Sequence, residues 1–264
     1  MTSAKTKSTK RPARRKGRPR QTPHLPAQDI IDLLGPSYGP YQHASRMDPA
    51  EEVVYTILSQ HTSDINSMRA FHQLMAEFES LEAVAQGDVR RIESAITRGG
   101  LAKVKAPRIK QVLNLILEKR GNLDLSFLAE MPLQEAKAWM RELPGIGPKS
   151  AAVILCFSLG MPAMAVDTHV HRVAKRLGLI GSKTSADDAH ELLEPMVAPE
   201  QVYAFHVSLI THGRRVCKAL RPLCGECLLA FGCPSRELAT APVKPSKAKA
   251  KPAGSSVRPA KASG

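Results

Sequence analysis

Apolar residues recur at helical spacing along most of this chain, in short segments that glycine or proline separates. No segment alternates between apolar and polar residues with the period of two that marks a half-buried strand. Aromatic residues make up only 4% of the 264 residues, so smaller apolar side chains must fill the core, which favours packed helices. The predicted fold is therefore all-α. Helices are expected over residues 28–34, 49–59, 64–78, 81–86, 89–97, 102–120, 126–130, 133–143, 148–159, 168–177, 185–196 and 199–216.

The net charge of +14 lies almost entirely at the two ends of the chain. Residues 1–22 carry nine lysines and arginines and residues 240–264 carry six, with no acidic residue in either segment. The rest of the chain has 23 of the 38 basic residues against all 24 acidic ones. Because both ends offer little to bury, residues 1–23 and 237–264 are predicted to be disordered basic tails. Such tails attract nucleic acid without regard to sequence, although a merely solubilising role is the alternative.

The chain has no segment that is typical of export or of a membrane span. No apolar stretch of signal-peptide length follows the basic N-terminal run. The most apolar window, residues 151–166, is short for a membrane span and contains Pro162. We therefore expect an intracellular protein without membrane attachment.

Two glycines separate two predicted helices in the stretch L-P-G-I-G-P-K, residues 143–149. Gly145 and Gly147 can adopt positive φ and let a ligand approach the backbone closely. Such a turn directs free backbone N–H groups outward at a helix start, where they can hold a phosphate. An ordinary tight turn is the alternative. The predicted contacts to a nucleic-acid backbone are Gly145, Ile146, Gly147 and Ser150.

Lys149 follows this turn and begins an apolar helix, which is an awkward place for a lysine. A lysine is costly to bury, and a helix N-terminus already carries partial positive charge. A lysine amine is a nucleophile only when it is neutral, and at the ordinary pKa of about 10.4 roughly one amine in a thousand is neutral near pH 7.4. Partial burial and the helix N-terminus both disfavour the ammonium, so the position suits a Schiff-base nucleophile. The alternatives are a stem packed on the helix with its amine in water, or a simple phosphate contact.

Asp167 lies eighteen residues after Lys149, immediately before a predicted helix. An N-cap is at least as good an explanation of this aspartate as a catalytic role. A carboxylate beside a lysine can also take up a proton or stabilise a cationic transition state, and the two roles are compatible. The next two residues, Thr168 and His169, are candidates for a substrate pocket, although His169 serves a core equally well.

Four cysteines follow the last long helix with the spacing C-x6-C-x2-C-x5-C. In an intracellular chain, four thiols so close together indicate a zinc ion or an iron–sulfur cluster rather than two disulfides. Zinc ribbons usually contain two C-x2-C pairs, and this chain has only one, so the spacing favours a cluster. Between the first two cysteines, Lys218 and Arg221 form a cationic loop that is predicted to contact DNA backbone. The predicted ligands are Cys217, Cys224, Cys227 and Cys233, whereas Cys156 is expected in the core.

Three motifs together resemble endonuclease III, a helix-hairpin-helix DNA glycosylase with abasic-site lyase activity. They are L-P-G-I-G-P-K-S-A, V-D-T-H eighteen residues after the lysine, and the cysteine spacing. The resemblance covers residues 26–234. It implies a [4Fe-4S] cluster on the four cysteines, Lys149 as the nucleophile that attacks C1′ of the damaged nucleotide, and Asp167 as the essential carboxylate. It also implies a monomer whose partner is double-stranded DNA with a damaged base or abasic site. The implied location is the cytoplasm, in association with the nucleoid, or the nucleus if the protein is eukaryotic.

The resemblance further implies two helical domains with the DNA and the flipped base between them. One would be a continuous six-helix domain at residues 44–161, with the helix-hairpin-helix at about 132–160. The other, which would hold the cluster, would join residues 24–43 to residues 162–236.

The flipped base leaves a gap in the duplex that the protein must fill. Family members insert a leucine, which corresponds to Leu101, and a glutamine from a segment that resembles L-S-Q-H-T-S-D. In this chain the glutamine position holds His61, and Gln60 lies one place earlier, so either residue is a candidate. Ordinary packing in a turn is an equally good explanation of Leu101. A polar residue at a helix start is an equally good explanation of His61. Ala102 replaces an aromatic residue that often follows the leucine.

These features favour a bifunctional glycosylase that removes oxidised pyrimidines of the thymine glycol class and nicks the strand 3′ to the abasic site by β-elimination. An adenine or mismatch-thymine glycosylase of the same superfamily is one alternative. Its adenine-removing members typically lack the lysine and carry a further C-terminal domain. A non-catalytic helix-hairpin-helix module that binds DNA backbone is the other. Only the joint presence of Lys149 and Asp167 at family spacing argues against such a module.

Overall fold

A computed structural model describes residues 25–43, 45 and 47–236. Within these residues every regular element is a helix, which confirms the all-α prediction. The tails predicted at 1–23 and 237–264 lie outside the described residues.

The α-helices are α1 (Ala27–Tyr38), α2 (Pro49–Ser59), α3 (Asp64–Phe78), α4 (Leu81–Gln86), α5 (Val89–Ala95), α6 (Ala102–Arg120), α7 (Leu133–Arg141), α8 (Pro148–Leu159), α9 (Thr168–Arg176), α10 (Ala186–Leu193) and α11 (Val202–Arg215). Short 3-10 helices are η1 (Thr97–Gly99), η2 (Ser126–Glu130), η3 (Glu194–Met196), η4 (Pro199–Gln201), η5 (Cys224–Glu226) and η6 (Ala230–Gly232).

Side-chain caps fix the starts of many of these helices. Asp48 and Glu51 form a capping box at the start of α2, where Pro49 occupies the first helical position. Ser63, Ser80, Asp88 and Ser185 accept backbone N–H groups at the starts of α3, α4, α5 and α10. Each cap satisfies donors that have no partner within the helix, so the sequence predicts these starts closely.

Some helix ends differ from the prediction. The segment expected to stop at residue 34 continues through Pro36 to Tyr38, because Tyr38 packs against a buried cluster and its hydroxyl contacts His212 Nδ1 at 3.2 Å. The segment at 126–130 is a 3-10 helix. Further 3-10 turns occur at 97–99, where the helix expected over 89–97 ends, and at 194–196 and 199–201 within the helices expected over 185–196 and 199–216. Proline or glycine occurs in each of those last three turns, which limits regular α-helical hydrogen bonding.

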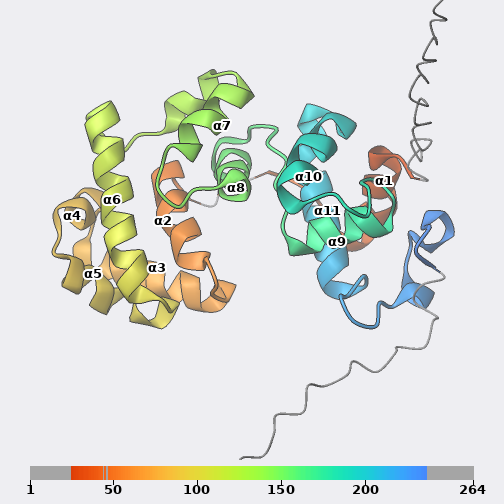
Figure 1. The fold of residues 1–264 in the computed structure, drawn as a ribbon, viewed down its shortest axis with the longest axis horizontal. Coiled ribbons are helices and arrows are strands. Elements are labelled where there is room, and N and C mark those ends of the chain that lie inside the picture. Colours follow the sequence, from red (N-terminus) through yellow and green to blue (C-terminus); the bar gives the residue numbers. More distant parts are fainter. Residues whose placement is uncertain (1–24, 44, 46, 237–264) are drawn as a thin grey trace, which may run out of the picture.

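The buried apolar residues form two clusters. One cluster lies among α2 to α8, and the other lies among α1, α9, α10, α11 and the cysteine segment that follows. Figure 1 shows these two sets of helices on opposite sides of the molecule. The chain crosses between them after α1 and again after α8, so residues near both ends of the described chain share one cluster. The exact boundaries expected from the sequence, 44–161 against 24–43 with 162–236, stay a prediction.

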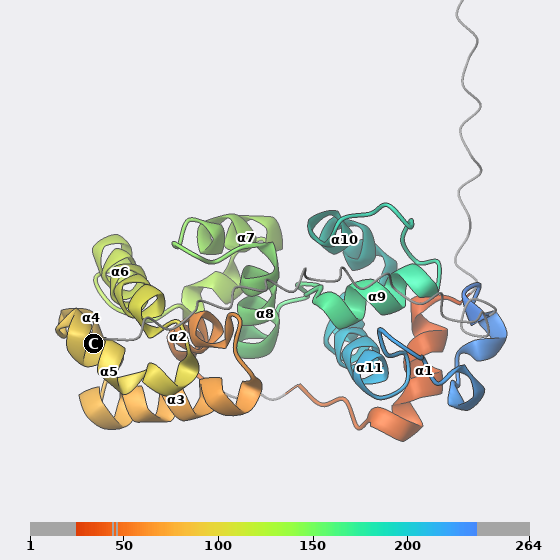
Figure 2. The same cartoon turned by 60° about the horizontal axis from the view of Figure 1, so that its bottom comes forward.

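Among the described residues, two ion pairs join the two sets of helices, which are α2 to α8 in one half and α1 with α9 to α11 in the other. Lys137 on α7 meets Glu194 at 2.5 Å, and the same carboxylate accepts the backbone N–H of Met164 in the crossing segment at 3.0 Å. Asp64 on α3 meets Arg214 on α11 at 3.5 Å. The turned view in Figure 2 again separates α2 to α8 from α1 and α9 to α11. Among the described residues, no helix is both long and apolar enough to cross a membrane.

Candidate active site between the two helical halves

The hairpin predicted at residues 132–160 consists of α7, a turn and α8. Gly145 has a φ of 84°, which only glycine adopts without strain. Pro148 is the first residue of α8, and Gly147 precedes it with no side chain to cap the helix. The N-terminus of α8 therefore has free backbone donors, as the sequence predicts for a phosphate-binding turn.

Not every residue of the turn is available to a ligand. The side chain of Ile146 is buried, and its N–H already donates to the carbonyl oxygen of Leu143 at 3.0 Å. This residue holds the turn against the core, so the expectation that it contacts DNA holds at most for its carbonyl. In the described residues, the N–H groups of Gly145, Gly147, Lys149 and Ser150 have no hydrogen-bond acceptor.

Lys149 lies in the first turn of α8 with an exposed side chain. Among the residues that the structure describes, its amine has no hydrogen-bond or ion-pair partner. The expectation of partial burial was wrong for the free protein, because α8 presents this first turn outward rather than to the core.

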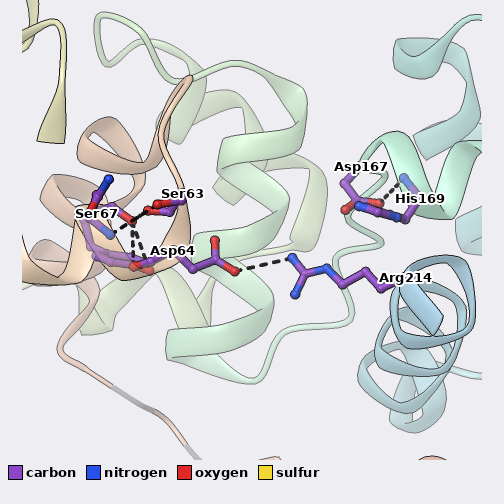
Figure 3. Close-up of polar contacts among 8 residues, drawn as sticks. Ser63, Asp64, Ser67, Asp167, His169 and Arg214 are labelled. Atoms are coloured by element: carbon purple, nitrogen blue, oxygen red, sulfur yellow. Dashed lines mark hydrogen bonds and ion pairs between the residues drawn. The ribbon is translucent and has the colours of Figure 1, made fainter.

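Asp167 is partly buried and caps α9. One carboxylate oxygen accepts the N–H groups of His169 at 2.8 Å and Val170 at 2.7 Å. Figure 3 shows this contact to His169 on the α9 side, with Arg214 and Asp64 paired beside it. The capping role that the sequence suggested is thus present, and the second carboxylate oxygen accepts no hydrogen bond from the described residues.

The two residues after Asp167 differ in their surroundings. The side chain of Thr168 is exposed. The His169 ring is partly buried, and its Nδ1 lies 3.1 Å from Nη2 of Arg172. Arg172 also donates through Nε to the carbonyl oxygen of Cys217 at 2.9 Å. A hydrogen-bonded route therefore joins the start of α9 to the cysteine segment. No sequence motif indicated Arg172 as part of it.

Lys149 and Asp167 flank the segment that crosses between the halves, and they make no direct contact. His206 on α11 is buried, and its Nδ1 lies 2.8 Å from the carbonyl oxygen of Ala165 in the crossing segment. Burial lowers the pKa of His206, the Ala165 contact and the Asp167 carboxylate oppose that shift, and the Lys149 ammonium adds to it. Both charges thus act at one buried histidine, which sequence spacing could not reveal because it comes from another helix.

The two candidates for duplex insertion near the end of α2 are in different environments. Gln60 donates through Nε2 to the carbonyl oxygen of Gly145 at 2.9 Å, and Arg108 approaches its Oε1 at 3.4 Å. His61 is exposed and has a φ of 56°. Leu101 has nearly the same conformation, with a φ of 54°, and its side chain is 55% exposed. The structure thus ties Gln60 to the hairpin turn and leaves His61 and Leu101 as two exposed loop tips.

The four cysteines line one cavity of about 410 Å³ together with Arg176 and His212. In the described part of the chain, no three metal-binding side chains lie close enough to share a single ion. Four thiols on one cavity are a donor set that a zinc ion or an iron–sulfur cluster takes. Burial, followed by the charges of neighbouring cysteines, raises the pKa of the Cys227 and Cys233 thiols, and backbone hydrogen bonds from Leu229 and Ser235 oppose that shift.

The cationic loop after Cys217 is exposed at both Lys218 and Arg221, and Arg221 has a φ of 54°. Arg176 on α9 holds the backbone of this loop: its guanidinium donates to the carbonyl oxygens of Lys218 at 2.7 Å and Ala219 at 3.0 Å. It also lies 3.3 Å from Sγ of Cys217. Cys156 is buried in the core, as expected, and burial raises its pKa to about 12.

Residues 54–199 match the family described as "HhH-GPD superfamily base excision DNA repair protein". Endonuclease III of Thermotoga maritima is 33% identical over 70% of this chain and 83% of its own length. A non-covalent endonuclease III–DNA complex aligns with a TM-score of 0.67 and 26% identity, over 81% of this chain and 98% of the other. The estranged-adenine complex of a trapped endonuclease III–DNA covalent intermediate gives the same four values. This chain belongs to the endonuclease III family, within the HhH-GPD superfamily, and is a DNA glycosylase.

Proposed function

We propose that this protein is a bifunctional DNA glycosylase and abasic-site lyase that removes oxidised pyrimidines of the thymine glycol class from double-stranded DNA. The observation that carries the proposal is the amine of Lys149, which is exposed and unpartnered in the described structure beside four free backbone N–H groups. A relative of the same fold forms a trapped covalent intermediate with DNA, which supports a nucleophilic residue in this family.

The chemistry starts when the neutral amine of Lys149 attacks C1′ of the damaged nucleotide. A bond forms between Nζ and C1′, and the glycosidic bond breaks, with its electron pair leaving on the base, which takes up a proton. The sugar ring then opens: the C1′–O4′ bond breaks, O4′ takes up the proton that the nitrogen loses, and the resulting iminium at C1′ acidifies the C2′ proton. Loss of that proton to a base expels the 3′ phosphate by β-elimination and nicks the strand. Water then hydrolyses the imine and restores the lysine.

Asp167 has two tasks in this proposal. The oxygen that caps α9 fixes the carboxylate at the start of that helix, so the side chain is already ordered before DNA binds. Its second oxygen can accept a proton from the amine or stabilise the positive charge that develops at C1′. Thr168, exposed beside it, is a candidate contact to the flipped base.

DNA binding divides between three parts of the molecule. The free N–H groups of the hairpin turn hold a backbone phosphate, which positions the duplex without regard to sequence. His61 and Leu101 fill the place of the flipped nucleotide. Lys218 and Arg221, in the loop that Arg176 of α9 holds, add cationic contacts to the DNA backbone.

We propose that the four cysteines hold a [4Fe-4S] cluster. When bound, it supplies a structural clamp for the cationic loop rather than chemistry at the sugar. Arg176 and the carbonyl contacts that it makes fix the near side of the same loop. The cluster and Arg176 would together keep Lys218 and Arg221 in place.

Covalent trapping tests the central step. Wild-type protein is mixed with a duplex that carries one thymine glycol, in the presence of borohydride, beside Lys149→Ala and the control Lys175→Ala, which removes a lysine from α9. A covalent band for the wild type and the control alone establishes the Schiff base and its residue. No band for any protein, with DNA binding intact, would instead indicate a glycosylase that uses water.

A further inference from the structure

Lys105 on α6 is 2% exposed and is among the largest fully buried side chains of the described structure. Its ammonium donates to the carbonyl oxygen of Leu58 at 2.6 Å, to the Thr62 hydroxyl at 2.8 Å and to the carbonyl oxygen of Gly99 at 2.9 Å. A lysine has three N–H donors, so every one of them is used. The Thr62 hydroxyl in turn donates to the carbonyl oxygen of Gly99.

These contacts join two loops that are far apart in sequence. Leu58 and Thr62 flank the end of α2, where His61 is the exposed tip. Gly99 lies just before Leu101, the exposed tip at the start of α6. The ammonium therefore lies beneath both tips, and the main chain of α6 adds a further link, because the N–H of Lys105 donates to the carbonyl oxygen of Leu101 at 3.0 Å.

Burying a lysine ammonium costs more free energy than burying an apolar side chain of similar volume. Burial lowers the pKa of Lys105, since the charged form loses its hydration. A methionine would occupy a similar volume without that cost, but it would leave the Leu58 and Gly99 carbonyl oxygens without this donor. What the lysine provides, and an apolar side chain does not, is a fixed spacing between two backbone loops.

We propose that Lys105 is a positioning residue that holds His61 and Leu101 at the separation needed to enter the duplex together. The inference rests on the proposed roles of those two tips. Because the loops are ordered when the protein folds, their conformational entropy is not lost again when DNA binds, and the energy of insertion can go to unstacking the base. Loosened tips would enter the duplex more slowly, even if the hairpin still holds the phosphate.

The test compares Lys105→Met with Lys110→Met. Lys110 lies on the same helix and also donates to a loop, at the partly buried carbonyl oxygen of Gly87 at 2.6 Å, but it contacts neither tip. The DNA carries tetrahydrofuran, a stable abasic analogue, with 2-aminopurine on the opposite strand. Insertion unstacks that base and raises its fluorescence, so stopped-flow mixing measures insertion without any bond cleavage.

Lys105→Met is expected to slow the fluorescence rise about tenfold relative to wild type, with Lys110→Met close to wild type. Thr62→Val removes the bridging hydroxyl and is expected to act in the same direction, whereas Thr62→Ser keeps the hydroxyl and the wild-type rate. These two variants keep the test valid if Lys105→Met does not fold.

Equal slowing by the two lysine variants would overturn the proposal, because it would show only a general loss of stability. Unchanged insertion in Lys105→Met and Thr62→Val would also overturn it, as would a wild-type protein that gives no fluorescence rise. Since tetrahydrofuran cannot form a Schiff base, these outcomes do not depend on whether Lys149 is the nucleophile or thymine glycol the substrate.

Discussion

Gln60 donates a hydrogen bond to the carbonyl oxygen of Gly145 over 2.9 Å and so connects the end of α2 to the hairpin turn. His61, the next residue, is exposed. Sequence alignment on Asp64 left both residues as candidates for duplex insertion. The structure separates their surroundings: the Gln60 side chain is bound to the hairpin turn, and the His61 side chain is exposed.

This difference predicts distinct defects for two alanine variants. His61→Ala is expected to slow the 2-aminopurine response while leaving the thermal midpoint near the wild-type value, because an exposed side chain contributes little to stability. Gln60→Ala is expected to destabilise the fold by about 1 kcal/mol through the lost hydrogen bond and to weaken phosphate binding by the turn. The same insertion defect in both variants, with no loss of stability, would contradict this assignment.

Asp167→Asn is expected to separate capping from catalysis. Asparagine caps a helix nearly as well as aspartate, so the free energy of unfolding should change by less than about 1 kcal/mol. The variant lacks the negative charge, and single-turnover base release should fall by about a hundredfold. Thermal unfolding and a glycosylase assay on the same preparation measure the two effects. Near-normal base release by Asp167→Asn would leave the residue as a cap alone.

Arg176→Met is expected to loosen the cationic loop, because the loop loses the guanidinium that donates to the carbonyl oxygens of Lys218 and Ala219. The expected results are faster iron release to a chelator and weaker DNA binding at low salt. Lys175→Met on the same helix is the control, since Lys175 makes no polar contact with the described residues. Absorbance during chelation and binding across a salt series give the measurements. Matching iron-release rates in the two variants would remove Arg176 from this role.

Two of the buried histidines, His190 and His206, predict a loss of stability in acid. Burial lowers the pKa of both His190 and His206 from 6.5 in the folded protein. Below pH 6.5 the unfolded chain therefore binds protons that the folded chain does not, so stability is full above that pH and falls as the pH decreases. His190 contacts the carbonyl oxygen of Met164 through Nδ1 at 2.7 Å, beside the charges of Lys137 and Glu194.

His190→Asn can keep a donor for the Met164 carbonyl but cannot titrate. The free energy of unfolding of this variant should decrease less steeply between pH 6.5 and pH 5 than that of the wild type. Chemical denaturation at several pH values gives the two slopes. Parallel slopes would show that His190 is not a source of the acid sensitivity.

The sequence by itself determined the helices, their starts and the family. Local rules were sufficient for these, because Asp48, Ser63 and Pro148 act on backbone groups within the next turn. The same rules placed Lys149 at a helix start and Asp167 at a cap, since both positions depend only on neighbouring residues.

Only the tertiary structure decided which side chains meet across the chain. It placed His206 where the charges of Lys149 and Asp167 act on it, and it exposed the lysine that the sequence had suggested was partly buried. It also turned Gln60 toward Gly145, and it buried Lys105 beneath two loops. Periodicity marks one face of a helix but does not say what packs against it. The partners come from residues tens of positions away, and packing and hydrogen-bond satisfaction in three dimensions select them.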